Sequence, residues 1–125
     1  MKRLSMVAVS IIVGLLSVAS VSWAALITPS GITGYGTYNN NKDIIVDGTI
    51  PPNGTGWTDN QCVYWNGTSP YFVINLGGAY NLDSITASVD NNDYYTIQYS
   101  VNSTDWSPLW DISTSDGTVG WGMDT

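Results

Sequence analysis

The residues that could do chemistry in this chain are mostly aspartates. All ten acidic residues are Asp, and the sequence contains no His, no Glu and one cysteine, Cys62. The absence of His excludes Ser-His-Asp triads, His general bases and His-ligated zinc. A single Cys excludes an intrachain disulfide and a Cys-based metal cluster. Paired carboxylates act in glycosidases, but Asp83, Asp90 and Asp93 fall in predicted turns, so we expect no enzymatic activity.

Sugar binding is one chemistry for which the remaining residue types are candidates. Aromatic faces stack on the apolar side of a pyranose ring, and Asn and Asp side chains hydrogen-bond to its hydroxyls. The predicted ligand-binding residues are therefore Trp57, Asp90, Asn91 and Asn92. The alternatives are that Trp57 packs in the core and that residues 90–93 form a solvated turn. For Cys62 we expect a buried, inert thiol; the alternative is a disulfide between two chains.

Charge limits the partners of this chain. The sequence contains three basic and ten acidic residues, so its net charge is −7. Binding to a phosphate backbone needs clustered Lys and Arg, so nucleic acid is excluded as a partner. Hydrophobic residues reach 43%, which argues against disorder.

The N-terminus has the layout of a secretory signal peptide. Lys2 and Arg3 precede an apolar stretch over residues 6–21, and Ser22 and Ala24 place small residues before a cleavage site. The alternative is an uncleaved membrane anchor, for which the apolar run is short. We predict a signal peptide over residues 1–24 and a mature domain over 25–125. This domain keeps one base, Lys42, so its net charge is −9, and we expect no stable membrane span after cleavage.

The mature chain is predicted to be all-β. Helix formers are sparse after residue 25, whereas Val, Ile, Thr, Tyr and Trp are plentiful. The predicted strands cover residues 62–65, 71–76, 84–89, 94–101 and 108–112, with weaker ones starting at Leu26 and around 119–121. Alternation of apolar and polar residues is clearest over 95–101 and 85–89, which is typical of strands with one buried face. The apolar run at 71–74 is expected in the middle of a sheet.

Several segments resemble a known family. They are, in chain order, Asp47-Gly48, Thr55-Gly56-Trp57, residues 71–77 (YFVINLG), residues 80–85 (YNLDSI), residues 93–100 (DYYTIQYS) and Asp105-Trp106. Their order and spacing resemble the discoidin family, the coagulation-factor type C domain of the galactose-binding-like superfamily. The match covers roughly residues 26–125, and Asn75 stands where the family has Asp.

The resemblance implies an antiparallel jelly-roll β-sandwich. The family has eight core strands, but only six or seven can be counted here, and no closing strand is recognised before Thr125. We therefore expect a C-terminally truncated copy with an open sheet edge that promotes self-association. Many exported bacterial proteins with this domain end in a Pro-Glu-Pro sorting tail, which residues 1–125 do not contain.

The resemblance also implies a ligand and a metal. Asp47 and Thr55 occupy positions similar to the family's structural calcium loop, whose oxygen ligands suit Ca²⁺; the alternative is an Asp-Gly turn without metal. The function it implies is a non-catalytic carbohydrate-binding or adhesion module, for a polysaccharide. The protein would act as a secreted, periplasmic or cell-surface component. The alternative function is a structural surface or matrix component without a defined ligand.

Overall fold

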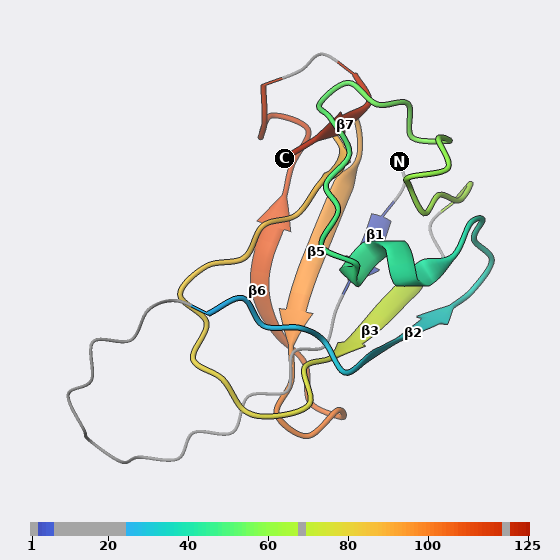
Figure 1. The fold of residues 1–125 in the computed structure, drawn as a ribbon. Coiled ribbons are helices and arrows are strands. Elements are labelled where there is room, and N and C mark those ends of the chain that lie inside the picture. Colours follow the sequence, from blue (N-terminus) through green and yellow to red (C-terminus); the bar gives the residue numbers. More distant parts are fainter. Residues whose placement is uncertain (1–2, 7–24, 68–69, 119–120) are drawn as a thin grey trace.

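A computed structural model describes residues 3–6, 25–67, 70–118 and 121–125 (Figure 1). The described part of the chain is built from short strands and one 3₁₀ helix. The elements are β1 (Arg3–Met6), β2 (Gly31–Tyr35), η1 (Lys42–Val46), β3 (Tyr71–Asn75), β4 (Val89–Asp90), β5 (Tyr94–Tyr99), β6 (Ser107–Ile112) and β7 (Met123–Asp124). The prediction that residues 25–125 are all-β is confirmed for the described part of this range.

The strands pair in three small sheets. In the first, β5 lies between β1 and β6, while β2 pairs with β3 and β4 pairs with β7. The pairs β2–β3, β4–β7 and β5–β6 are antiparallel, and β1 runs parallel to β5. Figure 1 shows β1 between β5 and β3, so it lies where two of the sheets approach each other.

The alternation predicted over residues 95–101 holds for the first part of β5 and fails after Tyr99, where Ser100 is buried and Val101 is 50% exposed. Tyr95 and Ile97 are buried, and their partners on β6 are Ile112 and Trp110. The register shifts between Ile97 and Gln98. Pro108 lies on β6, an edge strand of this sheet. Proline has no N–H to donate to a neighbouring strand, and an edge strand tolerates this because one of its sides has no strand partner.

The core lies between the inner faces of β3 and β5. Its buried members are Phe72, Leu76, Val89, Tyr95, Ile97 and Ile112. Phe72 is fully buried, and the Tyr38 ring meets it edge-on at a centroid distance of 5.0 Å. Gly34 makes room for Tyr38, because a Cβ at this position would collide with the Tyr38 ring.

Some predicted strands are confirmed and others are wrong. Those at 71–76, 94–101 and 108–112 correspond to β3, β5 and β6. The strands predicted at 62–65, at Leu26 and over 84–89 are wrong: residues 62–65 contribute only an isolated bridge at Tyr64, the segment at Leu26 contains none, and of 84–89 only Val89 lies in a strand. The alternation predicted over 85–89 is not seen in the burial, because Ile85 is 40% exposed and Ser88 is half-buried like Ala87. Only Val89 and Asp90 have a described strand partner. The weak strand around 119–121 falls partly on residues 119–120, outside the described part.

Two further strands differ from the sequence analysis. β2 was not predicted, because Gly31 and Gly34 weaken a strand pattern. β3 forms backbone hydrogen bonds with β2 in a two-stranded sheet. The prediction that β3 lies in the middle of a sheet, with a hydrogen-bonded strand on each side, is therefore wrong.

The two ends of the sequence also take part in pairing. β7 is a short C-terminal strand that the sequence analysis did not predict. β1 lies inside the predicted signal peptide, whose other residues, 1–2 and 7–24, are outside the described part. Among the described residues, no helix is long and apolar enough to cross a membrane.

Candidate functional site

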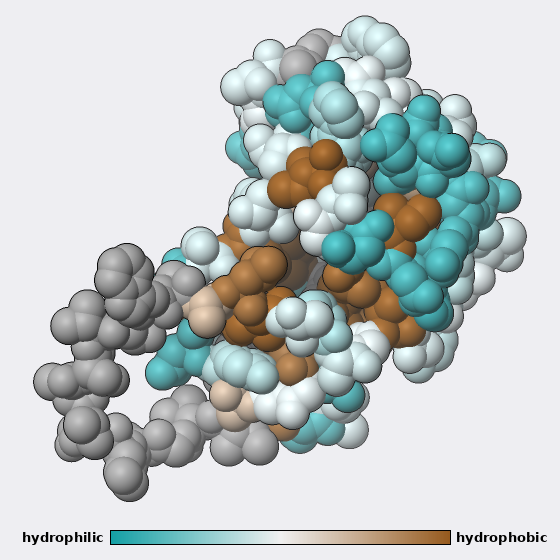
Figure 2. Space-filling model, viewed as in Figure 1, coloured by the Kyte–Doolittle hydropathy of each residue, from teal (hydrophilic) through white to brown (hydrophobic). Residues whose placement is uncertain are grey.

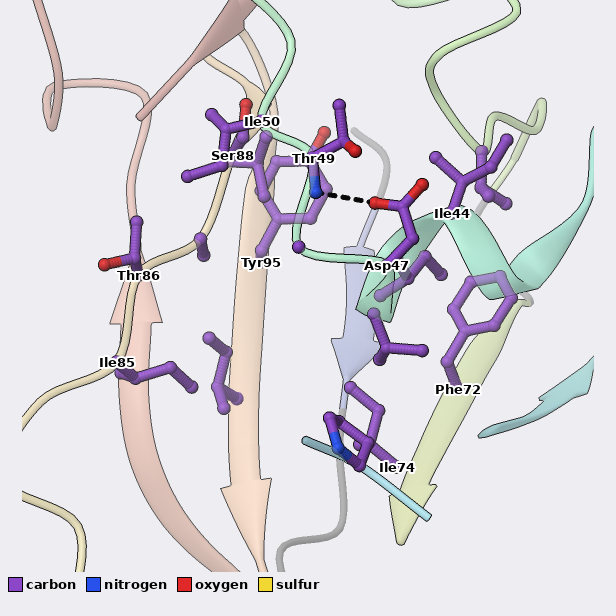
Figure 3. A pocket seen from close by; sticks show the side chains of 18 of the residues that line it. Ile44, Asp47, Thr49, Ile50, Phe72, Ile74, Ile85, Thr86, Ser88 and Tyr95 are labelled. Atoms are coloured by element: carbon purple, nitrogen blue, oxygen red, sulfur yellow. Dashed lines mark hydrogen bonds between the residues drawn. The ribbon is translucent and has the colours of Figure 1, made fainter. Parts of the chain in front are cut away.

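A cleft of about 1040 Å³, here called the central cleft, lies between β3, β5 and the segments 44–51 and 80–90. Its walls include Phe72 and Ile74 from β3, Tyr95 from β5, and Ile85 (Figure 3). Figure 2 shows apolar residues gathered around this hollow, with hydrophilic residues beside it.

The polar lining of the central cleft is acidic. Asp47, Asp83, Asp90 and Asp93 are lining residues, and no Lys or Arg is found among the described residues that line it. Carboxylates without a nearby cation give a negative potential, which repels anionic ligands. The cleft therefore suits neutral or cationic ligands.

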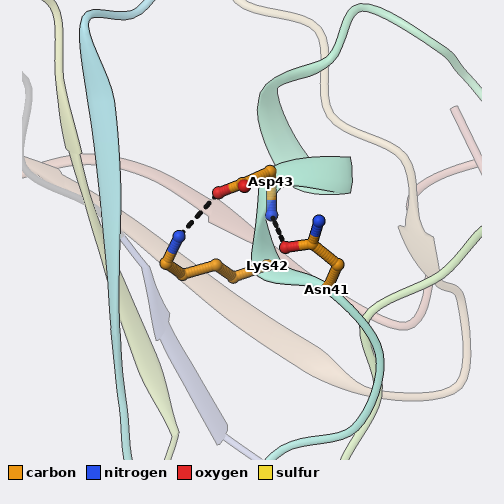
Figure 4. Close-up of polar contacts among 3 residues, drawn as sticks. All are labelled: Asn41, Lys42 and Asp43. Atoms are coloured by element: carbon orange, nitrogen blue, oxygen red, sulfur yellow. Dashed lines mark hydrogen bonds and ion pairs between the residues drawn. The ribbon is translucent and has the colours of Figure 1, made fainter.

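Lys42 does not offset this charge. It lies at the start of η1, where its Nζ is 2.6 Å from the Asp43 carboxylate (Figure 4). The hydrogen bond from Lys42 holds the pKa of Asp43 below its ordinary value. Asn41 caps the helix by accepting a hydrogen bond from the Asp43 backbone N–H at 3.1 Å. The single base of residues 25–125 is thus engaged beside the cleft without lining it.

Trp57 reaches the central cleft from a loop. Its side chain is half-buried, and its ring meets Tyr64 edge-on at a centroid distance of 5.4 Å. The loop is shaped by a turn in which the Thr55 hydroxyl donates to the Pro52 carbonyl at 2.6 Å. Trp57 is therefore neither a core residue nor fully exposed, and one part of its ring is left to line the cleft.

The predicted ligand residues after Trp57 divide into two groups. Asp90 lines the central cleft, but it is buried, at 5% exposure, and lies in β4. The reading of Asp90 as a solvated turn residue is wrong. Asn91 and Asn92 do not line the cleft: the Asn91 backbone donates to the Gly122 carbonyl, and the Asn92 amide donates to the Asp90 carboxylate at 3.3 Å.

The two predicted calcium ligands serve local structure. One oxygen of the exposed Asp47 carboxylate accepts from the Thr49 backbone N–H at 2.7 Å, which closes a turn around Gly48 at φ 81°. The Thr55 carbonyl accepts from the Met123 N–H at 2.8 Å. Asp47 lines the cleft and Thr55 does not. Among the described residues, no group of three acidic, His or Cys side chains could hold a metal.

The C-terminal strand holds the loop that carries Trp57. On one side β7 pairs with β4, and on the other the Gly54 N–H donates to the Met123 carbonyl at 2.8 Å. The buried Asp124 carboxylate accepts from the Asn53 amide and from the backbone N–H groups of Thr118 and Thr125. β7 thereby ties the Trp57 loop to the strand that bears Asp90.

Two residues of the cleft were missed by the sequence analysis. Trp65 Nε1 and Ser88 Oγ are buried and have no hydrogen-bond partner within the described structure, and both residues line the central cleft. An unmet buried donor is costly. Both residues belong to runs predicted as strands, 62–65 and 84–89, so their residue types alone did not mark them as part of a site.

Burial also changes the acidity of two neighbouring groups. It raises the pKa of the Tyr95 hydroxyl, and the Asp93 and Asp90 carboxylates add to this effect. It also raises the pKa of the Cys62 thiol, again with help from nearby carboxylates, Asp59 and Asp90. The expected burial of Cys62 is confirmed at 3% exposure. Both groups stay protonated at neutral pH and supply neither a nucleophile nor a base.

Comparison of the chain with family models, curated proteins and solved structures finds no match.

Proposed function

We propose that this chain is a non-catalytic, exported carbohydrate-binding or adhesion module of the discoidin type, with a jelly-roll sandwich as its parent architecture. The motifs at 47–57 and 71–100 support the family, and the signal-like N-terminus supports a secreted, periplasmic or cell-surface location. Fold resemblance alone is a weak argument for function, so the main support for the proposal comes from the residues of the central cleft.

The observation that carries the proposal is the position of Trp57 at the cleft. A half-buried indole, fixed edge-on by Tyr64, offers a rigid aromatic surface at small entropic cost. Asp47 and Asp90 line the same cleft and offer carboxylate oxygens to sugar hydroxyls. Trp65 Nε1 and Ser88 Oγ add donors that have no protein partner in the described structure.

The negative charge of the cleft limits the class of polysaccharide that it can bind. Lining carboxylates with no described Lys or Arg among them disfavour uronic acids and sulfated sugars. We therefore propose a neutral or amino-sugar polysaccharide as the ligand, bound without bond cleavage.

A glycan array probed with the full chain tests this proposal. We expect binding to neutral or amino sugars and none to uronate or sulfated ones. Trp57→Ala should abolish the signal, whereas the matched control Trp121→Ala should retain it, because Trp121 is 64% exposed and does not line the cleft. Equal binding by both variants would contradict the assignment of Trp57.

A structural surface or matrix component is the second candidate. It is favoured by exposed apolar side chains on the edge strand β6, where Leu109 is 40% and Trp110 is 37% exposed. Such residues promote contact between copies. A chain that binds no glycan on the array but sediments as an oligomer would favour this second function.

A further inference from the structure

The strand β1 occupies a slot with a strand on each side. It pairs in parallel with β5, with Arg3 opposite Tyr94 and Met6 opposite Ile97. On its other side it lies next to β3 (Figure 1), whose described ladder partner is β2. The distance between neighbouring strands is about 4.8 Å, so the space beside β5 is suited to one extended strand rather than to a folded domain.

Removal of residues 1–24 would empty this slot. β5 would keep β6 on one edge and would lose the partner of its other edge. An open edge presents N–H and C=O groups that recruit another extended chain. The neighbouring side chains favour an apolar occupant, because Phe72, Tyr95 and Ile97 are buried on the two bordering strands.

The acidic residues at one end of the slot favour one chain direction for the strand that occupies it. Asp90 and Asp93 lie just before β5, at the end where β1 begins. The residue of β1 in register at this end is Arg3, opposite Tyr94. A strand that enters with a basic residue and continues with apolar ones therefore matches both the acidic end and the apolar length of the slot.

We propose that the slot between β5 and β3 is a strand-acceptor site. In the precursor the chain's own Arg3–Met6 segment fills it. After cleavage at Ala24 it takes an extended peptide segment in trans, with a basic residue ahead of apolar residues. This proposal rests on cleavage and uses the edge of β5 rather than Trp57, although Phe72 and Tyr95 border the slot and also line the central cleft.

Competition between the tethered and the added strand tests the proposal. The probe is a fluorescein-labelled peptide with the sequence of residues 1–8, and the proteins are three full-length chains. In Leu4→Pro/Ser5→Pro the missing N–H groups weaken β1 pairing, whereas the control Leu4→Ala/Ser5→Ala keeps its backbone donors. A tethered strand competes at an effective concentration of about 1 mM, so it should block a micromolar peptide.

The expected result is a rise in anisotropy with the proline variant and at least about tenfold weaker binding by the wild type and the alanine control. A peptide carrying the same two prolines should not bind. If the proline variant does not fold alone, the peptide should restore its cooperative melting. Absence of both binding and restoration would overturn the proposal, as would equal binding by all three chains.

Disulfide formation checks the register of β1 independently. In a Cys62→Ser background, Ser5→Cys should cross-link to Thr96→Cys, its partner across the ladder. It should not cross-link to Gln98→Cys, two residues further along the same strand. Equal cross-linking to both positions would show that β1 does not occupy this slot.

Discussion

The Asn53 amide donates a hydrogen bond to the buried carboxylate of Asp124, 3.0 Å away and 71 positions later in the sequence. The same carboxylate accepts from the backbone N–H groups of Thr118 and Thr125. One side chain thus joins the C-terminal strand to the loop that leads to Trp57. The geometry of the central cleft depends on this connection.

Asp124→Ala should therefore lower the free energy of unfolding by about 2–4 kcal/mol, because it removes the buried acceptor of three hydrogen bonds. Asp124→Asn keeps one oxygen and should cost less. Urea unfolding of the full chain measures both, with the exposed Asp83→Ala as a control that should change by less than about 0.5 kcal/mol. Additive losses in Asn53→Ala and Asp124→Ala would contradict the coupling between these two residues.

Gly117→Ala should destabilise the same region. Gly117 has φ +95°, and a Cβ there would collide with the Asp124 carboxylate. We expect a loss of more than about 1 kcal/mol in unfolding free energy. The control is Gly31→Ala, since nothing lies within 4 Å of its added Cβ and its φ is not positive. A Gly117→Ala chain as stable as the Gly31→Ala chain would show that this contact is absent.

The stability of the chain should fall in alkali because of Tyr95. Burial, together with Asp93 and Asp90, raises the pKa of its hydroxyl above the ordinary 10.0. The unfolded state therefore loses this proton first, and stability present below about pH 10 is lost as the pH rises towards the folded-state value. Urea unfolding at several pH values should show a shallower decline for Tyr95→Phe than for wild type. The exposed Tyr94→Phe is the control and should follow the wild type.

Substitutions of Asp47 distinguish a calcium site from an Asp-Gly turn that binds no metal. Asp47→Asn keeps an oxygen for the Thr49 N–H and should melt like the wild type without calcium, whereas Asp47→Ala should lose about 1 kcal/mol. Repeating the melts with about 5 mM calcium tests the metal. A calcium-dependent rise in Tm for wild type but not for Asp47→Asn would support the calcium site; no rise would leave the turn as its role.

The sequence predicted those strands whose own pattern is strong. β5 follows from the alternation of Tyr95 and Ile97, and β3 from a continuous apolar run. The segment 84–88 alternates equally well but finds no described strand partner, because pairing depends on residues far away in the chain. β7 is too short to give a pattern, and it forms because Val89 and Asp90 lie opposite it.

The candidate site was predictable only in part. Trp57 and Asp90 could be chosen by residue type, and both line the central cleft. The burial of Asp90 and the unmet donors of Trp65 and Ser88 arise from tertiary packing. No local spacing encodes these features, so the sequence could not have separated them from ordinary turn and strand residues.

The most direct test of the proposed function is a titration of the ¹⁵N-labelled full chain with a neutral oligosaccharide, followed through its assigned tryptophan indole signals. We expect the Trp57 and Trp65 signals to shift with saturation, because both rings line the central cleft, and the exposed Trp121 signal to stay in place. Unchanged Trp57 and Trp65 signals across neutral and amino-sugar ligands would contradict carbohydrate binding at this cleft.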